Sequence, residues 1–96
     1  MKINKQSLSF SAYLNNQLKD PALKKHYREA EKQLEIAYKI LQLRKESGIS
    51  QLDLAKKLGT TQSNIARLEA GRQNFTTETL QKIATIFKRS LKIEFV

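Results

Sequence analysis

The chain lacks cysteine and tryptophan, and its 96 residues include one histidine, one proline and three glycines. Without cysteine there can be no disulfide, no thiolate nucleophile and no cysteine-ligated zinc site. The longest uninterrupted apolar run has three residues, which is too short for a membrane span. Lys2 and Lys5 are not followed by the apolar core of a signal peptide, so we expect a cytoplasmic protein that does not bind membranes.

Groups suited to catalysis are equally scarce. His26, the single histidine, lies among basic residues without an obvious acid or nucleophile beside it. Glu29, Glu31 and Glu35 are expected to be solvated or interface charges rather than an acid–base pair. The glycines mark helix ends and do not form a phosphate-binding loop. We therefore expect no catalytic residue, no bound metal and no cofactor, and predict that the protein is not an enzyme.

Positive charge is what the sequence has in excess. Eighteen Lys and Arg residues stand against nine Asp and Glu residues, which gives a formal net charge of +9. No block of five like charges occurs, and the excess is spread over both halves of the chain, so it belongs to a folded surface rather than to a tail. A surface of this sign is suited to a polyanion, most simply nucleic acid.

Helix-start and helix-stop residues predict a short helix over residues 7–18 and then one long helix. Asp20-Pro21 has the pattern of a helix start, and nothing interrupts the chain until about Glu46, before Gly48. The second half of this long helix is apolar on several sides and should enter the core. Its first half carries a narrow apolar seam that needs one partner surface, either another helix of a coiled coil or the chain's own N-terminal segment.

Three short helices are predicted after Gly48, and each begins at a side chain that can cap its first turn. The first starts with the spacing of a capping box, and the first two end at glycine. The residues concerned are Ser50, Asp53 and Gly59 for the first helix, Thr60 or Thr61 and Gly71 for the second, and Thr76 or Thr77 for the third. Residues 90–96 then alternate apolar and polar side chains, which predicts a strand that needs a pairing partner.

The first two of these short helices are joined around one glycine, which is the arrangement of a helix-turn-helix. At about 100° per residue, Ile65 and Leu68 define the buried side of the second helix. The opposite face is short and polar, so it is either simply solvated or able to enter a major groove, where Gln and Asn pair with adenine and Arg with guanine. That face comprises Gln62, Ser63, Asn64, Ala66, Arg67 and Ala70.

Residues 39–88 resemble the Cro/cI-type (XRE) helix-turn-helix family of phage and bacterial repressors. The resemblance rests on the run LRKESGISQLDLAKKLGTTQSNIARLEAGRQNFTTETLQKIA. This run has the family's leading basic helix, its glycine turn, a Gln at the start of each motif helix and the R-x-E-x-G end of the recognition helix. The resemblance implies an all-α fold: a five-helix domain over residues 36–89, extended by a long N-terminal helix and by one short C-terminal β-strand.

The same resemblance assigns roles to individual residues. It implies that Gln51 contacts a DNA phosphate, that the recognition helix meets base edges, and that the loop after it touches the DNA backbone again. It also implies a partly buried ion pair between Arg44 and Glu69, instead of two independent exposed charges, and a tight helix crossing at Ala55 and Gly59. The DNA-contacting residues expected in full are Gln51, Thr61, Gln62, Ser63, Asn64, Arg67, Arg72 and Asn74.

The segments around the motif resemble antitoxins of the HigA-like type, through the N-terminal D-P-x-x-K-x-x-Y pattern and the terminal I-x-F-V. This resemblance implies a repressor of its own operon that also neutralises a RelE-like, mRNA-cleaving toxin. Residues 90–96 would pair with a second copy through Leu91, Ile93 and Phe95, in a homodimer that places two recognition helices about 34 Å apart on operator DNA. Residues 1–35 would bind the toxin through Leu8, Phe10, Tyr13, Leu14, Leu23 and Tyr27.

Two other functions remain open from the sequence. One is a free-standing phage-type repressor whose N-terminal extension only completes the core or the dimer. The other is an adaptor that uses the helix-turn-helix for protein contacts alone. Deleting residues 1–20 is expected to abolish a toxin complex and to leave DNA binding largely intact.

Overall fold

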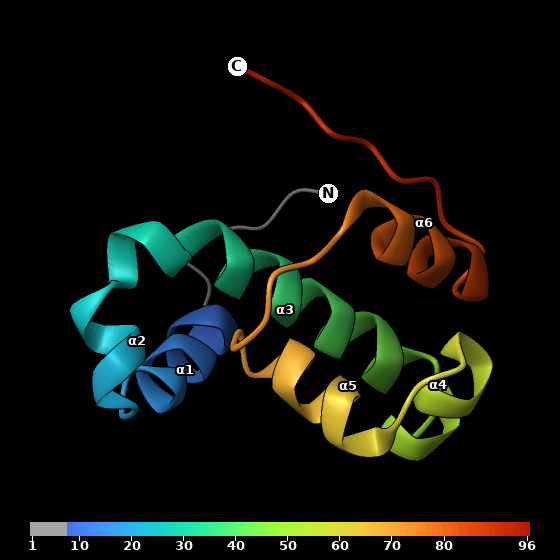
Figure 1. Cartoon of the computed structure of the whole chain (residues 1–96), viewed down its shortest axis with the longest axis horizontal. Helices are drawn as coiled ribbons and strands as arrows, with labels where there is room; N and C mark the ends of the chain where they lie inside the picture. The colour runs from blue at the N-terminus through green and yellow to red at the C-terminus, as the bar shows by residue number, and fades with distance from the viewer. Residues whose placement is uncertain (1–7) are drawn as a thin grey trace.

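The computed structural model describes residues 8–96, apart from the side chains of Leu8, Ser9 and Glu29. This part of the chain forms six helices (Figure 1), and α3 crosses the middle of the molecule, with α1 and α2 toward its start and α4 toward its end. Helix α5 runs beside α3. The helices are α1 (Leu8–Gln17), α2 (Pro21–Lys25), α3 (Tyr27–Glu46), α4 (Gln51–Leu58), α5 (Gln62–Glu69) and α6 (Thr77–Ile86).

The predicted long helix is in fact two helices, α2 and α3. Its start is as predicted, because Asp20 Oδ1 accepts a hydrogen bond from the Ala22 amide at 3.0 Å and Pro21 is the first helical residue. The helix is interrupted at His26, whose backbone angles (φ −112°, ψ 28°) are not helical. No glycine or proline marks this break. In the folded chain Asp20, which precedes α2, forms an ion pair with Arg72 after α5.

The core consists of two apolar clusters that share α3. The first lies between α3 and the last three helices, and the second lies between α3 and α1. As predicted, the second half of α3 enters the core. Of the two partners left open for the seam, the structure shows the chain's own N-terminal segment. The buried members are Ile40, Leu54, Ala55, Ile65, Leu68, Leu80 and Ile83 in the first cluster, and Phe10, Tyr13, Leu34, Ala37 and Tyr38 in the second.

The second cluster contradicts part of the predicted toxin-binding set. Phe10 is 2% exposed, and the Phe10 and Tyr13 rings lie 5.2 and 5.1 Å from the Tyr38 ring. Because an interface anchor needs exposed surface, Phe10 and Tyr13 are core residues in this fold. Deleting residues 1–20 would remove both, so this deletion would also take two residues out of the core. Leu8 lies outside the described side chains, and Leu14, Leu23 and Tyr27 are half-buried.

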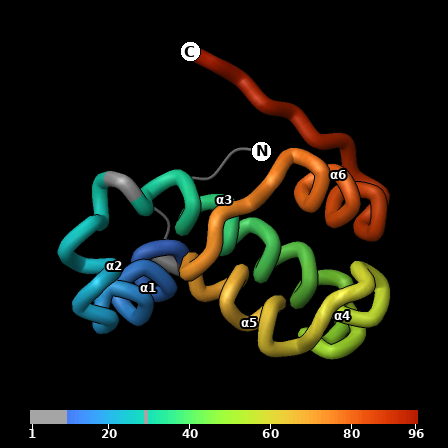
Figure 2. Tube along the Cα trace, in the orientation of Figure 1, coloured from blue at the N-terminus to red at the C-terminus, as the bar shows by residue number. Residues whose placement is uncertain are grey.

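The five-helix count and the C-terminal strand are also wrong. Residues 36–89 contain the second half of α3 and the three helices α4, α5 and α6, and residues 8–96 contain no strand. Residues 89–96 run away from the end of α6 as an extended segment (Figure 2). A strand is held by hydrogen bonds to a neighbouring strand, and the described chain offers no second one. Leu91 packs on the first cluster, whereas Ile93 is 57% exposed and Phe95 is fully exposed.

Within the described part of the chain, no helix is both long enough and apolar enough to cross a bilayer.

Candidate nucleic-acid interface

Helix α4 begins with the predicted capping box. Ser50 Oγ accepts a hydrogen bond from the Asp53 amide at 3.0 Å, and Asp53 Oδ2 accepts one from the Ser50 amide at 3.2 Å. Hydrogen bonding of the Asp53 carboxylate to the Ser50 backbone, and then to the Ser50 side chain, lowers the pKa of Asp53 below its ordinary value. The start of α4 is therefore fixed by two residues that lie three apart in the sequence.

Gly59, in the turn between α4 and α5, does not have the role predicted for it. Its φ is +76°, and a Cβ built on it would meet nothing within 4 Å, so no tight crossing occurs there. Glycine is needed at this position for the left-handed backbone that ends α4. Ala55 is buried in the first cluster, as expected of a small residue at a packed position.

Helix α5 has the orientation predicted for a recognition helix. Thr61 Oγ1 accepts a hydrogen bond from the Asn64 amide at 3.1 Å and caps the helix. Ile65 and Leu68 are buried, which confirms the inward side. On the opposite side Gln62, Ser63 and Arg67 are exposed, with Asn64 half-buried beside them. The polar face is open to solvent and is not covered by the described chain.

Gln73, which is not in the predicted set, forms hydrogen bonds with two residues of this face. With its amide oriented to satisfy both neighbours, Gln73 donates to Asn64 Oδ1 at 2.7 Å and accepts from Arg67 Nε at 2.6 Å. Asn64 Nδ2 also donates to Thr60 Oγ1 at 3.0 Å. Asn64 and Arg67 are thus held in place before any ligand arrives, which lowers the entropy lost on binding. The family resemblance assigned the loop around Gln73 to the DNA backbone, but nothing local pointed to this contact.

The remaining predicted DNA contacts lie around the recognition helix. Gln51 is directed at the protein interior, because its Nε2 donates to Glu69 Oε1 at 3.1 Å. Arg72 is exposed, and its guanidinium forms an ion pair with Asp20 Oδ2 at 3.1 Å. Asn74 is exposed in the loop after α5. This loop is therefore accessible, while Gln51 supports the recognition helix from α4.

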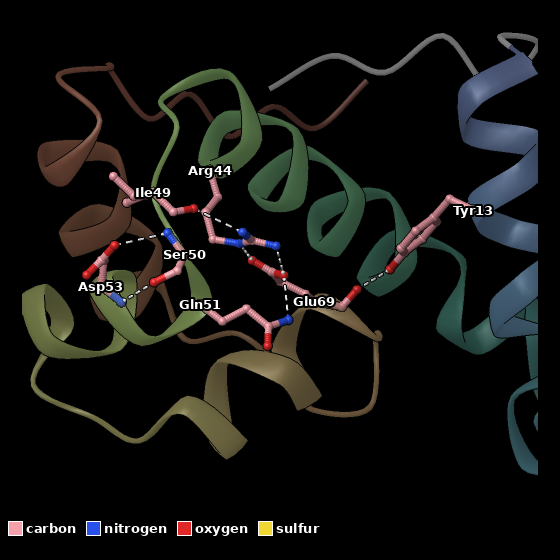
Figure 3. A network of polar contacts seen from close by, with 7 residues as sticks. All are labelled: Tyr13, Arg44, Ile49, Ser50, Gln51, Asp53 and Glu69. Carbon is pink, nitrogen blue, oxygen red and sulfur yellow. Dashed lines mark hydrogen bonds and ion pairs between the residues drawn. The ribbon is translucent and has the colours of Figure 1, made fainter.

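Glu69, the last residue of α5, is the centre of a buried polar network (Figure 3). Its side chain is 4% exposed, and its two carboxylate oxygens accept from Arg44 Nε at 2.6 Å and Arg44 Nη2 at 3.0 Å. Arg44 Nη1 also donates to the Ile49 carbonyl at 3.0 Å. The ion pair implied by the resemblance is thus present and bidentate, which is the geometry that makes a buried charge tolerable.

The end of α5 is closed by a Schellman motif. The Gly71 amide donates to the Leu68 carbonyl at 3.2 Å and the Arg72 amide donates to the Arg67 carbonyl at 3.0 Å. Gly71 has φ +74°, and a Cβ there would collide with the side chain of Leu34. The end of the recognition helix is therefore packed directly against α3.

Two further carbonyls at this end are bound by distant side chains. Tyr13 Oη, from α1, donates to the Glu69 carbonyl at 2.6 Å, and Gln33 Nε2, from α3, donates to the Gly71 carbonyl at 2.6 Å. Burial raises the pKa of Tyr13, and the Glu69 carboxylate raises it further, so the phenol remains a donor at neutral pH. Neither residue was predicted to touch the motif, since the sequence does not show which segment lies beside the end of α5.

Comparison with protein families returned one model, described as helix-turn-helix, which matches residues 40–93. The matched range begins in the second half of α3 and includes the whole of α4, α5 and α6. It covers more than half of the chain and contains the whole exposed polar face of α5. Neither the curated proteins nor the solved structures gave a match.

Proposed function

The chain belongs to the helix-turn-helix family, and we propose that it is a sequence-specific DNA-binding transcriptional repressor. One observation carries the proposal: α5 buries Ile65 and Leu68 and leaves Gln62, Ser63 and Arg67 exposed along one face. The net charge of +9 favours a polyanionic partner. In this proposal the protein binds and does not catalyse, and it needs no cofactor.

In the proposed complex α5 enters the major groove with its N-terminal residues meeting base edges. Arg67 is suited to guanine, and the amides of Gln62 and Asn64 are suited to adenine. Arg72 and Asn74, in the loop after α5, lie where they can approach the backbone. Phosphate contacts set the register of the protein on the duplex, and the base contacts provide specificity.

The proposal is tested with duplexes selected by the wild-type protein from a random-sequence pool. Arg67→Ala is expected to weaken binding to the selected duplex by on the order of 1–3 kcal/mol, with little change for a scrambled duplex. Arg28→Ala removes the same charge from an exposed position at the start of α3 and is the matched control. Fluorescence anisotropy at several salt concentrations measures both affinities.

Two results would contradict the proposal. If Arg67→Ala binds both duplexes as the wild type does, the exposed face of α5 does not read bases. If the wild type enriches no duplex and its binding does not weaken with salt, the protein is not a DNA-binding regulator, and the adaptor function takes precedence.

We also propose that the repressor is a homodimer joined through residues 90–96. Ile93 and Phe95 are exposed apolar residues at alternate positions, and Lys92 and Glu94, which alternate with them, form an ion pair at 2.7 Å. An extended segment of this kind can pair with its copy across a two-fold axis. Leu91 packs on its own chain, so pairing would depend on Ile93 and Phe95.

Sedimentation equilibrium tests the dimer. The double variant Ile93→Lys/Phe95→Lys is expected to be a monomer, because two buried apolar side chains become charged. Thr85→Lys, at an exposed position of α6, is the control and should remain dimeric. A double variant that sediments as a dimer would place the interface elsewhere.

For a protein partner we propose a RelE-like mRNA-cleaving toxin, so that the repressor is also an antitoxin. The support is the resemblance of the N-terminal segment to HigA-like antitoxins and the partly exposed apolar residues that it carries. With Phe10 and Tyr13 in the core, the predicted contact set keeps Leu8, whose side chain lies outside the described ones, and the half-buried Leu14, Leu23 and Tyr27. Basic residues, among them Lys24 and Lys25, surround these positions, so the toxin would need an acidic or neutral contact surface.

Co-expression with a small RNase-like protein encoded beside this chain tests the partner. We expect a complex that Leu23→Ser disrupts while affinity for the selected duplex is unchanged, because this substitution adds no charge and Leu23 lies on the five-residue helix α2, outside the exposed face of α5. If no complex forms with the wild type, the function is that of the free-standing repressor, whose N-terminal segment serves only the core.

A further inference from the structure

We propose that Tyr13 and Gln33 are positioning residues of the DNA interface: they fix the C-terminal end of recognition helix α5 from outside the helix-turn-helix. The inference rests on the proposed DNA-binding function and adds a role for the N-terminal segment within it. Neither side chain lies on the exposed face of α5, so each would act through the residues that it holds.

The argument begins with the backbone groups at a helix end. The last carbonyls of a helix have no partner inside it and must be satisfied by a cap, a side chain or water. In α5 the Schellman motif satisfies the carbonyls of Arg67 and Leu68. Tyr13 and Gln33 bind the carbonyls of Glu69 and Gly71, across 56 and 38 residues of sequence. Side chains from α1 and α3 thus bind the carbonyl of the last helical residue and one carbonyl just after the helix.

Two more contacts join the same regions. The Gly71 backbone lies against the side chain of Leu34, leaving no space for a Cβ, and Asp20 pairs with Arg72 at 3.1 Å. Helix α5 has only eight residues, so a shift at its end moves much of the helix. The N-terminal segment, α3 and the end of α5 therefore form one packed unit.

Gln73 connects these contacts at the end of α5 to the exposed polar face. Gln73 follows the held residues Gly71 and Arg72, and its amide bonds to both Asn64 and Arg67. If the backbone at Gly71 moved, Gln73 would move with it and would release the two side chains it holds. Base-edge contacts depend on such placement, whereas attraction to phosphates depends mainly on charge.

The inference predicts a selective loss of specific binding. Tyr13→Phe removes one hydroxyl and keeps the ring in the aromatic cluster. We expect affinity for the selected duplex to fall about five-fold, the equivalent of one hydrogen bond, while affinity for a scrambled duplex is unchanged. Gln33→Met, which removes the donor to Gly71, should act in the same direction, and the double variant should lose more than either.

The chain offers matched controls for both variants. Tyr38 lies in the same cluster, its ring 5.1 Å from that of Tyr13, but its hydroxyl accepts from Gln42 Nε2 within α3 at 3.0 Å. Tyr38→Phe and Gln42→Met therefore each remove a hydrogen bond of similar kind without touching α5. Both should lose stability in urea unfolding as the test variants do, yet bind the selected duplex as the wild type does.

The outcomes separate the two proposals. If Tyr13→Phe and Gln33→Met bind the selected duplex as well as their controls do, the two residues support only the fold and the inference is overturned. If the wild type selects no duplex, the proposed function fails instead. A specific loss confined to Tyr13→Phe and Gln33→Met would establish them as positioning residues.

Discussion

The two ends of helix α5 are held in different ways. At its start, Thr61 caps the helix through the amide of Asn64, three residues further on. At its end, the carbonyls and the Glu69 side chain are bound by residues from α1, α3 and α4. The start of the recognition helix is held by a local contact, whereas the end combines a local Schellman motif with contacts from distant helices. Substitutions at the two ends should therefore differ in how much they lower the free energy of unfolding and in how many helices they affect.

The largest effect is expected at the Glu69 network. Arg44→Met leaves the buried Glu69 carboxylate without its bidentate partner, which should lower the free energy of unfolding by about 3–5 kcal/mol. Lys45→Met, at the next and exposed position, should change it by no more than about 0.5 kcal/mol. Urea unfolding followed by circular dichroism measures both. A loss below about 1 kcal/mol for Arg44→Met would mean that the ion pair matters little to how α5 ends.

The next effect compares two glycines with the same backbone conformation. Gly59→Ala should cost about 1–2 kcal/mol, because a left-handed residue acquires a Cβ in open space. Gly71→Ala carries the same cost and adds the collision with Leu34, worth roughly a further 1–3 kcal/mol of overpacking. Thermal unfolding of the two variants measures the difference. Equal losses would show that α3 and the end of α5 can separate easily.

A smaller effect is expected at the start of α5. Thr61→Ala removes the cap and should lower the free energy of unfolding by about 1 kcal/mol. Thr61→Ser keeps the hydroxyl and should restore nearly all of it. Chemical denaturation of the three proteins measures this. If serine fails to restore stability, the Thr61 methyl group, rather than the cap, explains the loss.

The smallest effect concerns the equally local start of α4. Because hydrogen bonds from Ser50 lower the pKa of Asp53, the ionised carboxylate stabilises the fold above the ordinary pKa of 3.8, and this contribution is lost as pH falls through the lowered value. Below about pH 4, the wild type should therefore lose slightly more stability than Asp53→Asn does. Unfolding curves recorded from neutral to acid pH measure this. Parallel curves for the two proteins would contradict it.

The same division explains what the sequence could predict. The caps and the inward side of α5 follow from residues a few positions apart, so the sequence identified Ser50 and narrowed the other two caps to neighbouring threonines, of which Thr61 and Thr76 are the ones used. The break at His26 has no local cause, and so it was missed. From the sequence, the aromatic residues of α1 could contact either a partner protein or the chain's own core. Periodicity shows that a helix face is apolar, but it does not show which surface packs against that face.

The polar residues of the interface divide in the same way. Gln62, Ser63 and Arg67 follow from helical geometry alone. The contact of Gln73 with Asn64 and Arg67 and that of Gln33 with Gly71 need a chain that has already folded back, since amide side chains carry no pattern that distinguishes a bound from a solvated one. The family resemblance implies that Gln51 contacts a DNA phosphate, whereas in the structure its side chain donates a hydrogen bond to Glu69.

The pairing of Arg72 with Asp20 has a consequence for the ionic part of DNA recognition. An isolated arginine approaching a duplex displaces a condensed cation, and the release of that cation drives much of the association. Arg72 already has a carboxylate of its own chain beside it, so a phosphate reaching this loop would compete with that carboxylate for the guanidinium. The attraction at this point is then partly an exchange of one anion for another, and α2 influences how strongly the loop holds the double helix.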